Sequence, residues 1–465
     1  MKLRDAYERA PVPVQNLFAT GYGLRELPRR HGGRFRREVD ALDARQWWPV
    51  ERLLEDQERR LRAMATWCGT RVPHYREVFG AAGLGPDDLR TVDDLARLPV
   101  LDKETVRADP DRFLPDPPRP RLLPQTTGGT TGTPVRYWAT WDAVQANYAT
   151  YESRTRRWAG VRLGDRMASL HGQPIVPEGQ QGGPYWRRNL AFNQLYLSVY
   201  HLNESTLPEY TEALAAFDPE VVAGYTSAVH RVARHLIDTA QEGRLRPSAV
   251  LVSSETLTPA ARADMEQAFG CRVTNSYSLG ELVAYISECE RGRLHISTEY
   301  GVLEFVDQGE EHQEILATTL INRGMPLLRY RTGDLAVRGA QEPCDCGRGL
   351  PTVDAVIGRV DDLVHTPEGA TVGPAPMSLA FQRVPRLRRA QVRQDSVEEL
   401  TVLLEVAEGF GEEDRSFLEH ELRLRLGPTI RLHLEQVDVL PRTSGGKERL
   451  VVSSLGDGAA PGAST

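Results

Sequence analysis

The sequence predicts an α/β protein, with a large N-terminal domain of mainly parallel sheets and flanking helices and a small, mobile α+β C-terminal domain. Between about residues 218 and 275, apolar strand-like segments alternate with helical ones, which is the pattern of a parallel sheet. After about residue 360 the pattern changes to a hairpin, further strands and one amphipathic helix, a unit of plausible domain size. We expect domains at 1–360 and 361–453, and a disordered tail over 454–465.

Residues 1–125 are expected to be mostly helical. The run Glu51–Trp67 has apolar residues at helical spacing among many charges. A proline-rich stretch at 115–124 follows, and leads into a run of glycine and threonine.

The central region supplies the alternating elements. Strands are predicted over Glu220–Tyr225, Ala249–Val252 and Cys271–Asn275. Thr226 and Ser227 are the N-cap candidates of the first helix between them, which ends near Glu242, and the second helix begins at Pro259 and ends at Gly270. Because ligands of such sheets bind beyond the carboxyl ends of the strands, segments 253–255 and 276–281 are candidate binding positions.

The C-terminal unit is expected to contain one hairpin, two strands and a helix. They are predicted over Leu363–Val372 (hairpin), Leu400–Val406 and Ile430–Val437 (strands), and Glu412–Leu426 (helix).

Composition narrows the class of protein. The chain has 57 basic and 64 acidic residues, so its net charge of −7 favours neither nucleic acid nor an anionic membrane as a partner. No run approaches the ~20 apolar residues of a membrane span. The first residues lack a signal-peptide core, and five cysteines argue against a disulfide framework. We expect a cytoplasmic monomer or homodimer.

Lysine is scarce. Only Lys2, Lys103 and Lys447 occur among the 57 basic residues, and arginine takes the other positions. A lysine that remains is a candidate for a task that needs a compact ammonium group, and Lys447 lies in a glycine-rich turn.

The run at 126–134 suits a nucleotide phosphate. Its glycines allow close backbone approach, and its hydroxyls and amides can surround an anion. The residues expected to hold ATP phosphates are Thr126, Thr127, Gly128, Gly129, Thr130, Thr131 and Gly132. The run is not a Walker A loop, since no Gly-Lys-Ser/Thr follows, and the alternative is a flexible surface linker.

Five short segments, taken together in their order along the chain, indicate one protein family. They are the 126–134 loop, Asn275-Ser-Tyr-Ser-Leu-Gly-Glu281, Tyr330-Arg-Thr-Gly-Asp334, Gly358-Arg-Val-Asp-Asp362 and Pro441-Arg-Thr-Ser-Gly-Gly-Lys447. The series resembles the adenylate-forming superfamily of acyl- and aryl-CoA ligases over about residues 50–452. The form of the loop, with Ser287-Glu-Cys-Glu290, Leu294-His-Ile296 and Cys344-Asp-Cys-Gly-Arg348, resembles the phenylacetate–CoA ligase-like branch, including its CapK-like capsule-biosynthesis relatives.

The resemblance implies an ATP-dependent ligase that activates a small carboxylic acid as acyl-AMP and passes the acyl group to CoA. It implies catalytic roles for Lys447, which would bridge the carboxylate and the α-phosphate, and for Glu281, which would ligate Mg²⁺. It further implies that Asp334 binds the ribose with Arg359 nearby. The implied nucleotide-binding set is completed by Ser253, Ser254, Glu255, Asn275, Ser276, Tyr277 and Ser278. Asp361 would be the hinge about which the small domain rotates.

Two departures from the family pattern matter. Gly128 stands where many relatives have serine, and Gly280 stands where a hydroxyl residue usually precedes the glutamate. The segment 367–374 also differs from the form common in CoA ligases, which weakens the expectation of CoA as acceptor.

The acid pocket is expected near Trp138, His171 and Tyr225, whose rings would suit an aryl or otherwise planar acid. The alternative is that these three residues are ordinary core or surface aromatics without a role in binding.

A structural zinc site is expected at Cys289, His295, Cys344 and Cys346. Three thiols and one imidazole complete a tetrahedral Cys₃His set with no vacant position. The alternative is four unrelated small residues.

Other functions remain open. The acceptor could be an amine or a carrier-protein thiol in place of CoA. The chain could also be a non-catalytic nucleotide-binding module, although Lys447 and Glu281 together argue against it. A phosphotransferase lacks the lysine expected beside the loop.

Overall fold

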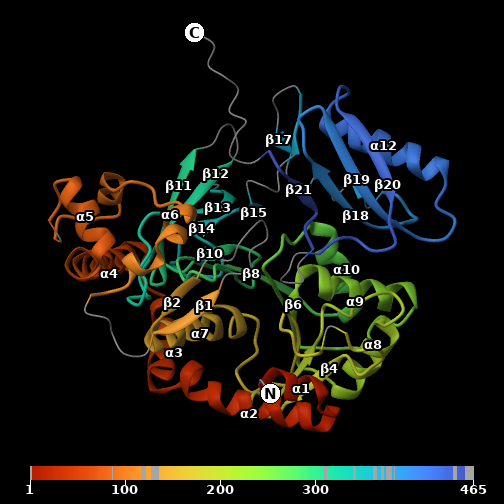
Figure 1. Ribbon diagram of the computed structural model, residues 1–465, viewed down its shortest axis with the longest axis horizontal. Coiled ribbons are helices and arrows are strands. Elements are labelled where there is room, and N and C mark those ends of the chain that lie inside the picture. The colour runs from red at the N-terminus through yellow and green to blue at the C-terminus, as the bar shows by residue number, and fades with distance from the viewer. Residues whose placement is uncertain are drawn as a thin grey trace.

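The computed structural model consists of a large lobe, up to Arg359, and a smaller C-terminal lobe from Val364 onward (Figure 1). It describes residues 3–85, 87–116, 122–126, 136–177, 179–307, 312–338, 342–359, 364–367, 371–372, 377, 380–381, 383–442 and 448–455. In Figure 1 the C-terminal lobe lies above helices α9 (Thr226–Asp238) and α10 (Pro259–Phe269) of the large lobe.

A nine-stranded sheet forms the centre of the large lobe. In spatial order its strands are β14 (Thr352–Val353), β10 (Leu294–Ile296), β9 (Tyr285–Glu288), β8 (Val273–Ser278), β7 (Ala249–Ser253), β6 (Val221–Tyr225), β3 (Met167–Leu170), β5 (Gln194–Leu197) and β4 (Trp186–Asn189). The five strands β5, β3, β6, β7 and β8 are parallel, and antiparallel strands extend the sheet at both edges. The predicted parallel sheet is therefore confirmed, and its central strands are buried on both faces, as apolar parallel strands require.

Helices pack around this sheet. The remaining helices of the large lobe are α1 (Leu3–Arg9), α2 (Val12–His31), α3 (Gly33–Arg45), α4 (Val50–Arg71), α5 (Pro73–Ala81), α6 (Lys103–Ala108), α7 (Trp141–Thr150) and α8 (Leu207–Phe217). Side chains of α8, α9 and α10 share one apolar core with β3, β5, β6 and β7. The N-terminal helix α2 contacts β4 and α7, along the lower side of Figure 1. None of the helices in the described ranges combines the length and the apolar character that spanning a bilayer needs.

Capping residues in the sequence predicted both ends of helix α10. The Thr258 side chain accepts from the Ala261 amide at 3.2 Å, Pro259 is the first residue of α10, and Gly270 ends the helix with φ +65°. Helix α9 begins at Thr226 with Tyr225 as its N-cap, so the predicted caps Thr226 and Ser227 lie inside the helix, and it ends at Asp238, before the predicted end near Glu242.

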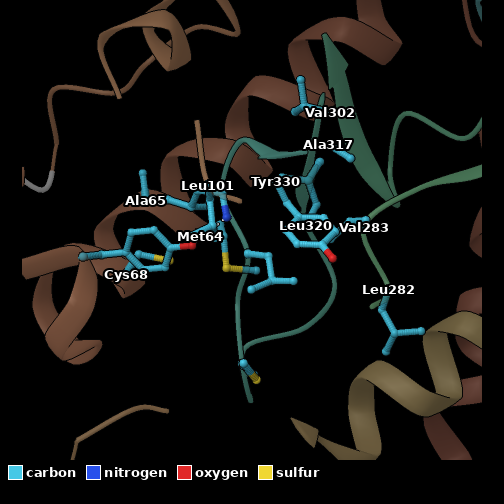
Figure 2. Close-up of a cluster of buried hydrophobic side chains, with 14 of the residues drawn as sticks. Met64, Ala65, Cys68, Leu101, Leu282, Val283, Val302, Ala317, Leu320 and Tyr330 are labelled. Carbon is cyan, nitrogen blue, oxygen red and sulfur yellow. Dashed lines mark hydrogen bonds between the residues drawn. The ribbon is translucent and has the colours of Figure 1, made fainter. Parts of the chain in front are cut away.

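A second sheet of four antiparallel strands lies beside the first. Its strands are β11 (Gly301–Asp307), β12 (Gln313–Thr319), β13 (Tyr330–Val337) and β15 (Ala355–Arg359). Its core reaches helix α4, where Met64, Ala65 and Cys68 lie close to Leu101 (Figure 2). Tyr330 and Leu320 belong to the same cluster, so the start of β13 is fixed by packing. A separate hairpin, β1 (Leu123–Thr126) with β2 (Arg136–Ala139), flanks the glycine and threonine run.

The C-terminal lobe is an α+β unit. Its sheet has the order β20 (Arg431–Gln436), β19 (Glu399–Val406), β18 (Leu387–Gln394) and β21 (Val451–Ser453). Helix α12 spans Glu412–Leu426, as predicted, and buries Leu418 and Leu422 in the core of the lobe. The predicted hairpin is present as β16 (Val364–His365) paired with β17 (Thr371–Val372). The predicted domain boundary and residues 456–465 of the predicted tail lie outside the described residues.

Candidate active site

The carboxyl ends of β7 and β8 lie side by side. These parallel strands pair Ser253 with Ser276, which brings two predicted nucleotide-binding residues together. The next residue, Ser254, is exposed and has φ +70°, a left-handed conformation that a non-glycine residue adopts at some cost. This turn directs the chain from the sheet toward Glu255.

The carboxylate of Glu255 is held at the start of helix α9. It accepts from the Ser227 amide at 2.7 Å, from the Ser227 hydroxyl at 3.1 Å and from the Glu448 amide at 3.0 Å. Burial raises the pKa of Glu255 to about 7, because removal from water disfavours the charged form. Glu255 therefore joins the large lobe to the C-terminal lobe, and its predicted place along the adenine stays a prediction.

Tyr277 and Asp334 form a hydrogen-bonded pair between the two sheets. The Tyr277 hydroxyl donates to Asp334 Oδ2 at 2.7 Å, and the Asp334 amide donates to the Thr332 hydroxyl at 3.0 Å. Asp334 is buried and lies directly across from Arg359 in the β13–β15 register. Burial, reinforced by the negative charge of Asp334, raises the pKa of Tyr277. The Tyr277 hydroxyl thus orients the buried carboxylate of Asp334.

Glu281 is buried beneath the same region. Its Oε1 accepts from the Tyr330 hydroxyl at 3.1 Å, and Leu282, the next residue, has φ +59°. Tyr330 and Leu282 are both anchored in the core shown in Figure 2. The position of Glu281 is therefore set from both sides by packing.

A cavity of about 220 Å³ opens beside Ser253 and Ser276. It is lined by Arg30, Tyr148, Tyr151, Arg156, Met167, Ser169, His171, Gln173, Gln194, Tyr196, Leu251, Val252, Ser253 and Ser276.

Of the three predicted pocket residues, His171 lines this cavity. Its Nδ1 is 3.0 Å from the Ser169 hydroxyl, and its ring meets that of Tyr225 edge-on at 5.6 Å. Tyr225 is thus next to the lining, whereas Trp138 packs against the core that contains Tyr330.

Several predicted residues lie outside the described residues. These are Thr127, Gly128, Gly129, Thr130, Thr131, Gly132, Asp361 and Lys447. Thr126 and Arg359 are described as backbone, at the ends of β1 and β15. Asn275 and Ser278 lie on β8 with Ser276 and Tyr277.

Glu448, the residue after Lys447, sits in a cluster of arginines. Its Oε1 accepts from Arg231 of the large lobe at 3.1 Å, and from Arg389 and Arg442 of the C-terminal lobe at 2.7 and 3.0 Å. Arg231 and Arg442 also donate to the Leu202 carbonyl, at 2.8 and 2.9 Å. Buried charges need such partners, so this group fixes the contact between the lobes.

The four predicted zinc ligands are together. One ligand atom from each of Cys289, His295, Cys344 and Cys346 lies within 4.8 Å of the others. His295 Nδ1 donates to the Leu350 carbonyl at 3.0 Å, which leaves Nε2 facing the sulfur atoms. Burial lowers the pKa of His295 to about 4, so the imidazole is in its neutral, ligating form. Thiols and a neutral imidazole fit Zn²⁺.

The structure adds residues that sequence reasoning missed. The cavity residues Arg30 and Arg156 come from the N-terminal helices and from a π-helix (Tyr151–Arg156) that continues α7. The contact residues Arg231 and Glu448 lie 217 positions apart. No sequence signal could have found them, because the π-helix, a feature that often marks functional sites, carries no sequence motif.

Sequence comparisons give two kinds of relative. Residues 364–454 match the family described as the CapK C-terminal domain. The chain is 28% identical to protein CapK of Staphylococcus aureus over 97% of its own length and 100% of CapK. It is 27% identical to the phenylacetate-coenzyme A ligase of Thermus thermophilus, over 87% of this chain and 97% of that ligase.

Among solved structures, 2-hydroxyisobutyryl-CoA ligase has the same fold. In its postadenylation state with R3-HIB-AMP it superposes with a TM-score of 0.70 at 18% identity, covering 88% of this chain and 91% of the ligase. In its thioesterification state with 2-HIB-AMP and CoA the TM-score is 0.54 at 19% identity, over the same shares of the two chains.

Proposed function

We propose that this protein activates a small carboxylic acid with ATP as acyl-AMP. The chain belongs to the adenylate-forming superfamily and to its branch of CapK and phenylacetate–CoA ligases. In a second step the acyl group passes to the thiol of CoA. The enzyme class is an AMP-forming acid–thiol ligase.

The observation that carries the proposal is the convergence of three features at one edge of the central sheet. The pair of Tyr277 and Asp334, the buried Glu281 and the cavity beside Ser276 all lie at or just beyond the end of β8. Ligands of open α/β sheets bind at this edge. A nucleotide with its ribose at Asp334 and its α-phosphate toward Glu281 would place an acid in the cavity next to the phosphorus that it attacks.

The residues then have defined tasks. An oxygen of the acid attacks the α-phosphorus, the bond to the β-phosphate oxygen breaks, and pyrophosphate leaves with that electron pair. Asp334 accepts hydrogen bonds from the ribose, the run 126–132 holds the departing phosphates, and Lys447 bridges the two reacting groups. Glu281 would hold Mg²⁺, which would supply charge neutralisation at the phosphates. Charge neutralisation and positioning are the main sources of rate in such a step.

The contact between the lobes supports an adenylation arrangement. Glu448 is hydrogen-bonded to Arg231 and, through its amide, to Glu255 of the large lobe, so the segment that follows Lys447 is attached beyond the end of β7. Rotation about Asp361 would then exchange this face for another during acyl transfer.

Two classes of acyl acceptor are compatible with this first step. The C-terminal lobe matches the CapK family, and segment 367–374 departs from the form common in CoA ligases. This favours, as the second candidate, transfer to an amine or a carrier-protein thiol after the same first step. Of the three predicted aromatic positions, His171 lines the cavity, where Tyr148, Tyr151 and Tyr196 also lie, and the proposal is made for a small carboxylic acid without requiring an aryl group.

We assign a structural Zn²⁺ to the Cys₃His cluster. Such an ion would join the segment containing Cys344 and Cys346 to strand β10 and the end of β9, and the Gly349 amide ties that segment to Gln46 at 3.0 Å. It lies within the large lobe and takes no part in the reaction.

Acid-dependent exchange of labelled pyrophosphate into ATP tests the proposal. We expect exchange with some member of a broad panel of small acids, and its loss in Lys447→Ala with ATP binding retained. Lys103→Ala, a substitution of another of the three lysines, is the matched control and should exchange as the unaltered protein does. Tight ATP binding with no exchange across the panel would instead indicate a non-catalytic nucleotide-binding protein. CoA, amines and hydroxylamine added to an active reaction would then identify the acceptor class.

A further inference from the structure

The cavity beside Ser253 and Ser276 is polar. Helices α2 and α7, the π-helix and strands β3, β5, β7 and β8 each contribute to its lining. At about 220 Å³ it is smaller than the ~300–1,000 Å³ typical of drug-sized ligands, so it suits a small acid. Most of its side chains can donate or accept hydrogen bonds, through hydroxyl, amide, imidazole or guanidinium groups.

The charge of the lining has one sign. Among its described residues are two guanidinium groups, those of Arg30 and Arg156, and no carboxylate. Both charges also act on His31. Its pKa is lowered to about 4, first by burial and then by the positive charges of Arg156 and Arg30. The cavity wall is therefore cationic where these two side chains meet it.

Arg156 is buried and lies over the ring of Tyr151 at 4.8 Å, and within the described part of the chain its hydrogen bonds are long. Its side chain is 3.5 Å from Glu152 Oε2 and 3.6 Å from the sulfur of Met167, both at the long limit of hydrogen bonding. Glu152 is engaged elsewhere, since both its oxygens accept from the Leu163 amide, at 3.0 and 3.2 Å. A buried guanidinium with five donors ordinarily has closer partners than these.

Arg30 reaches the cavity from helix α2. It lies over the ring of Tyr148 at 5.0 Å and over that of Phe192 at 5.5 Å, and its Nε is 3.5 Å from Glu26. Stacking fixes the guanidinium plane while leaving its edge available to a ligand. Glu26 has a closer partner in Arg29, at 2.8 Å. Both cavity arginines are thus positioned by neighbours that do not saturate them.

We infer that the acid which this pocket binds carries a second carboxylate, held by Arg30 and Arg156, while the carboxylate to be activated faces Ser253 and Ser276. The inference rests on the proposed function for the activation step and on the cavity alone for the binding step. Bidentate carboxylate recognition is what paired guanidinium groups provide. An apolar aryl acid would leave the two guanidinium groups with only their long contacts to Glu152 and Glu26, at 3.5 Å each, which is unfavourable.

Matched pairs of acids test this assignment. Butanedioate is compared with butanoate, pentanedioate with pentanoate, and benzene-1,4-dicarboxylate with 4-methylbenzoate. The readouts are kcat/KM for pyrophosphate exchange and the rise in Tm caused by each acid alone. We expect the unaltered protein to favour the better dicarboxylates over their partners by about tenfold or more in exchange, because charge-assisted hydrogen bonds are the strong ones.

Variants of the two arginines make the test specific. Arg156→Met should reduce the preference to about twofold or less, and Arg156→Lys should keep part of it. Arg157→Met is the matched control, because Arg157 is exposed and pairs with Asp43 and Glu152 outside the lining. If Arg156→Met does not fold, Arg30→Met and Arg156→Lys give the same comparison.

Each outcome supports or overturns one of the two proposals. Preference for the monocarboxylates, absence of a Tm rise with every dicarboxylate, or an unchanged preference in the arginine variants overturns the assignment. If no acid supports exchange but dicarboxylates raise the Tm of the unaltered protein and not of Arg156→Met, the proposed activation fails and this assignment stands. Exchange with monocarboxylates alone overturns this assignment and leaves the proposed activation standing.

Discussion

Arg231 and Glu448 join the two lobes, with Arg231 Nη2 3.1 Å from Glu448 Oε1. Arg231 is buried on helix α9, and Glu448 directly follows Lys447. Because one peptide bond separates Glu448 from Lys447, the proposed catalytic residue, we expect this ion pair to help position Lys447. Arg231 is a positioning residue, which touches no substrate itself.

Substitution of Arg231 should slow adenylation without weakening nucleotide binding. In Arg231→Met the carboxylate of Glu448 keeps Arg389 and Arg442 but loses its side-chain tie to the large lobe. We expect the maximal rate of pyrophosphate exchange to fall about tenfold, equivalent to ~1.4 kcal/mol in the barrier. The dissociation constant for ATP should stay within about twofold, because the nucleotide site is left intact.

Arg234→Met is the control for that experiment. Arg234 lies on the same helix, but its ion pairs with Asp238 and Asp264 are on the surface. Equal losses of rate in the two variants would show that a general loosening of helix α9 is the cause. An unchanged rate in Arg231→Met would remove the positioning role.

Glu255 should make stability depend on pH. Its pKa is about 7 in the folded protein because of burial, above the ~4.3 of an unfolded chain. Folding therefore favours the protonated form, and this contribution is complete below about pH 4.3 and is lost as pH rises through about 7. Glu255→Gln carries no charge at any pH, so its Tm relative to the unaltered protein should rise between pH 5 and 8. Glu104→Gln, at an exposed site, should show no such trend. A flat difference for Glu255→Gln would contradict the account.

Removal of zinc should destabilise the large lobe. Metal analysis is expected to find one Zn²⁺ per chain, and Cys289→Ser should lose it together with at least ~5 °C in Tm, the scale of one to a few kcal/mol in a domain of this size. Cys271→Ser, outside the cluster, should retain the metal. A metal-free preparation of full thermal stability would exclude a structural ion.

Loss of the Tyr277 hydroxyl should weaken ATP binding selectively. In Tyr277→Phe the buried Asp334 loses its 2.7 Å donor, so the carboxylate is less well oriented for the ribose. We expect the KM for ATP to rise about tenfold, in line with the ~1.5–3 kcal/mol of a hydrogen bond to a charged group, and the KM for the acid to change little. Tyr200→Phe, away from the nucleotide-binding set, is a suitable comparison. An equal rise in both KM values would indicate a structural defect instead.

The sequence predicted helices correctly where capping residues or regular apolar spacing define them. Pro259 and Gly270 bounded helix α10 correctly, and the apolar spacing of 412–426 gave helix α12 without error. The end of α9 was misplaced because Asp238 is followed by polar residues that suit either helix or turn. Such ends are set by packing against other elements, which sequence patterns do not contain.

The site was predictable only in part for a related reason. The order of motifs pointed to Asp334, Glu281 and the Cys₃His cluster, and the structure brings each into a coherent setting. Arg30 had no signal, because its role depends on how helix α2 packs against β4 and α7. Arg156 had none either, because a π-helix directs it to the cavity. Charged side chains that act across elements distant in sequence require the tertiary structure to be found.

The most direct measurement is the fate of the carboxylate oxygen. An active acid labelled with ¹⁸O in its carboxylate is incubated with the protein, ATP, Mg²⁺ and hydroxylamine, and the products are analysed by mass spectrometry. Attack on the α-phosphorus followed by acyl transfer predicts AMP that contains one ¹⁸O atom. Label in inorganic phosphate, or AMP without label while the hydroxamate accumulates, would contradict activation of the acid as acyl-AMP.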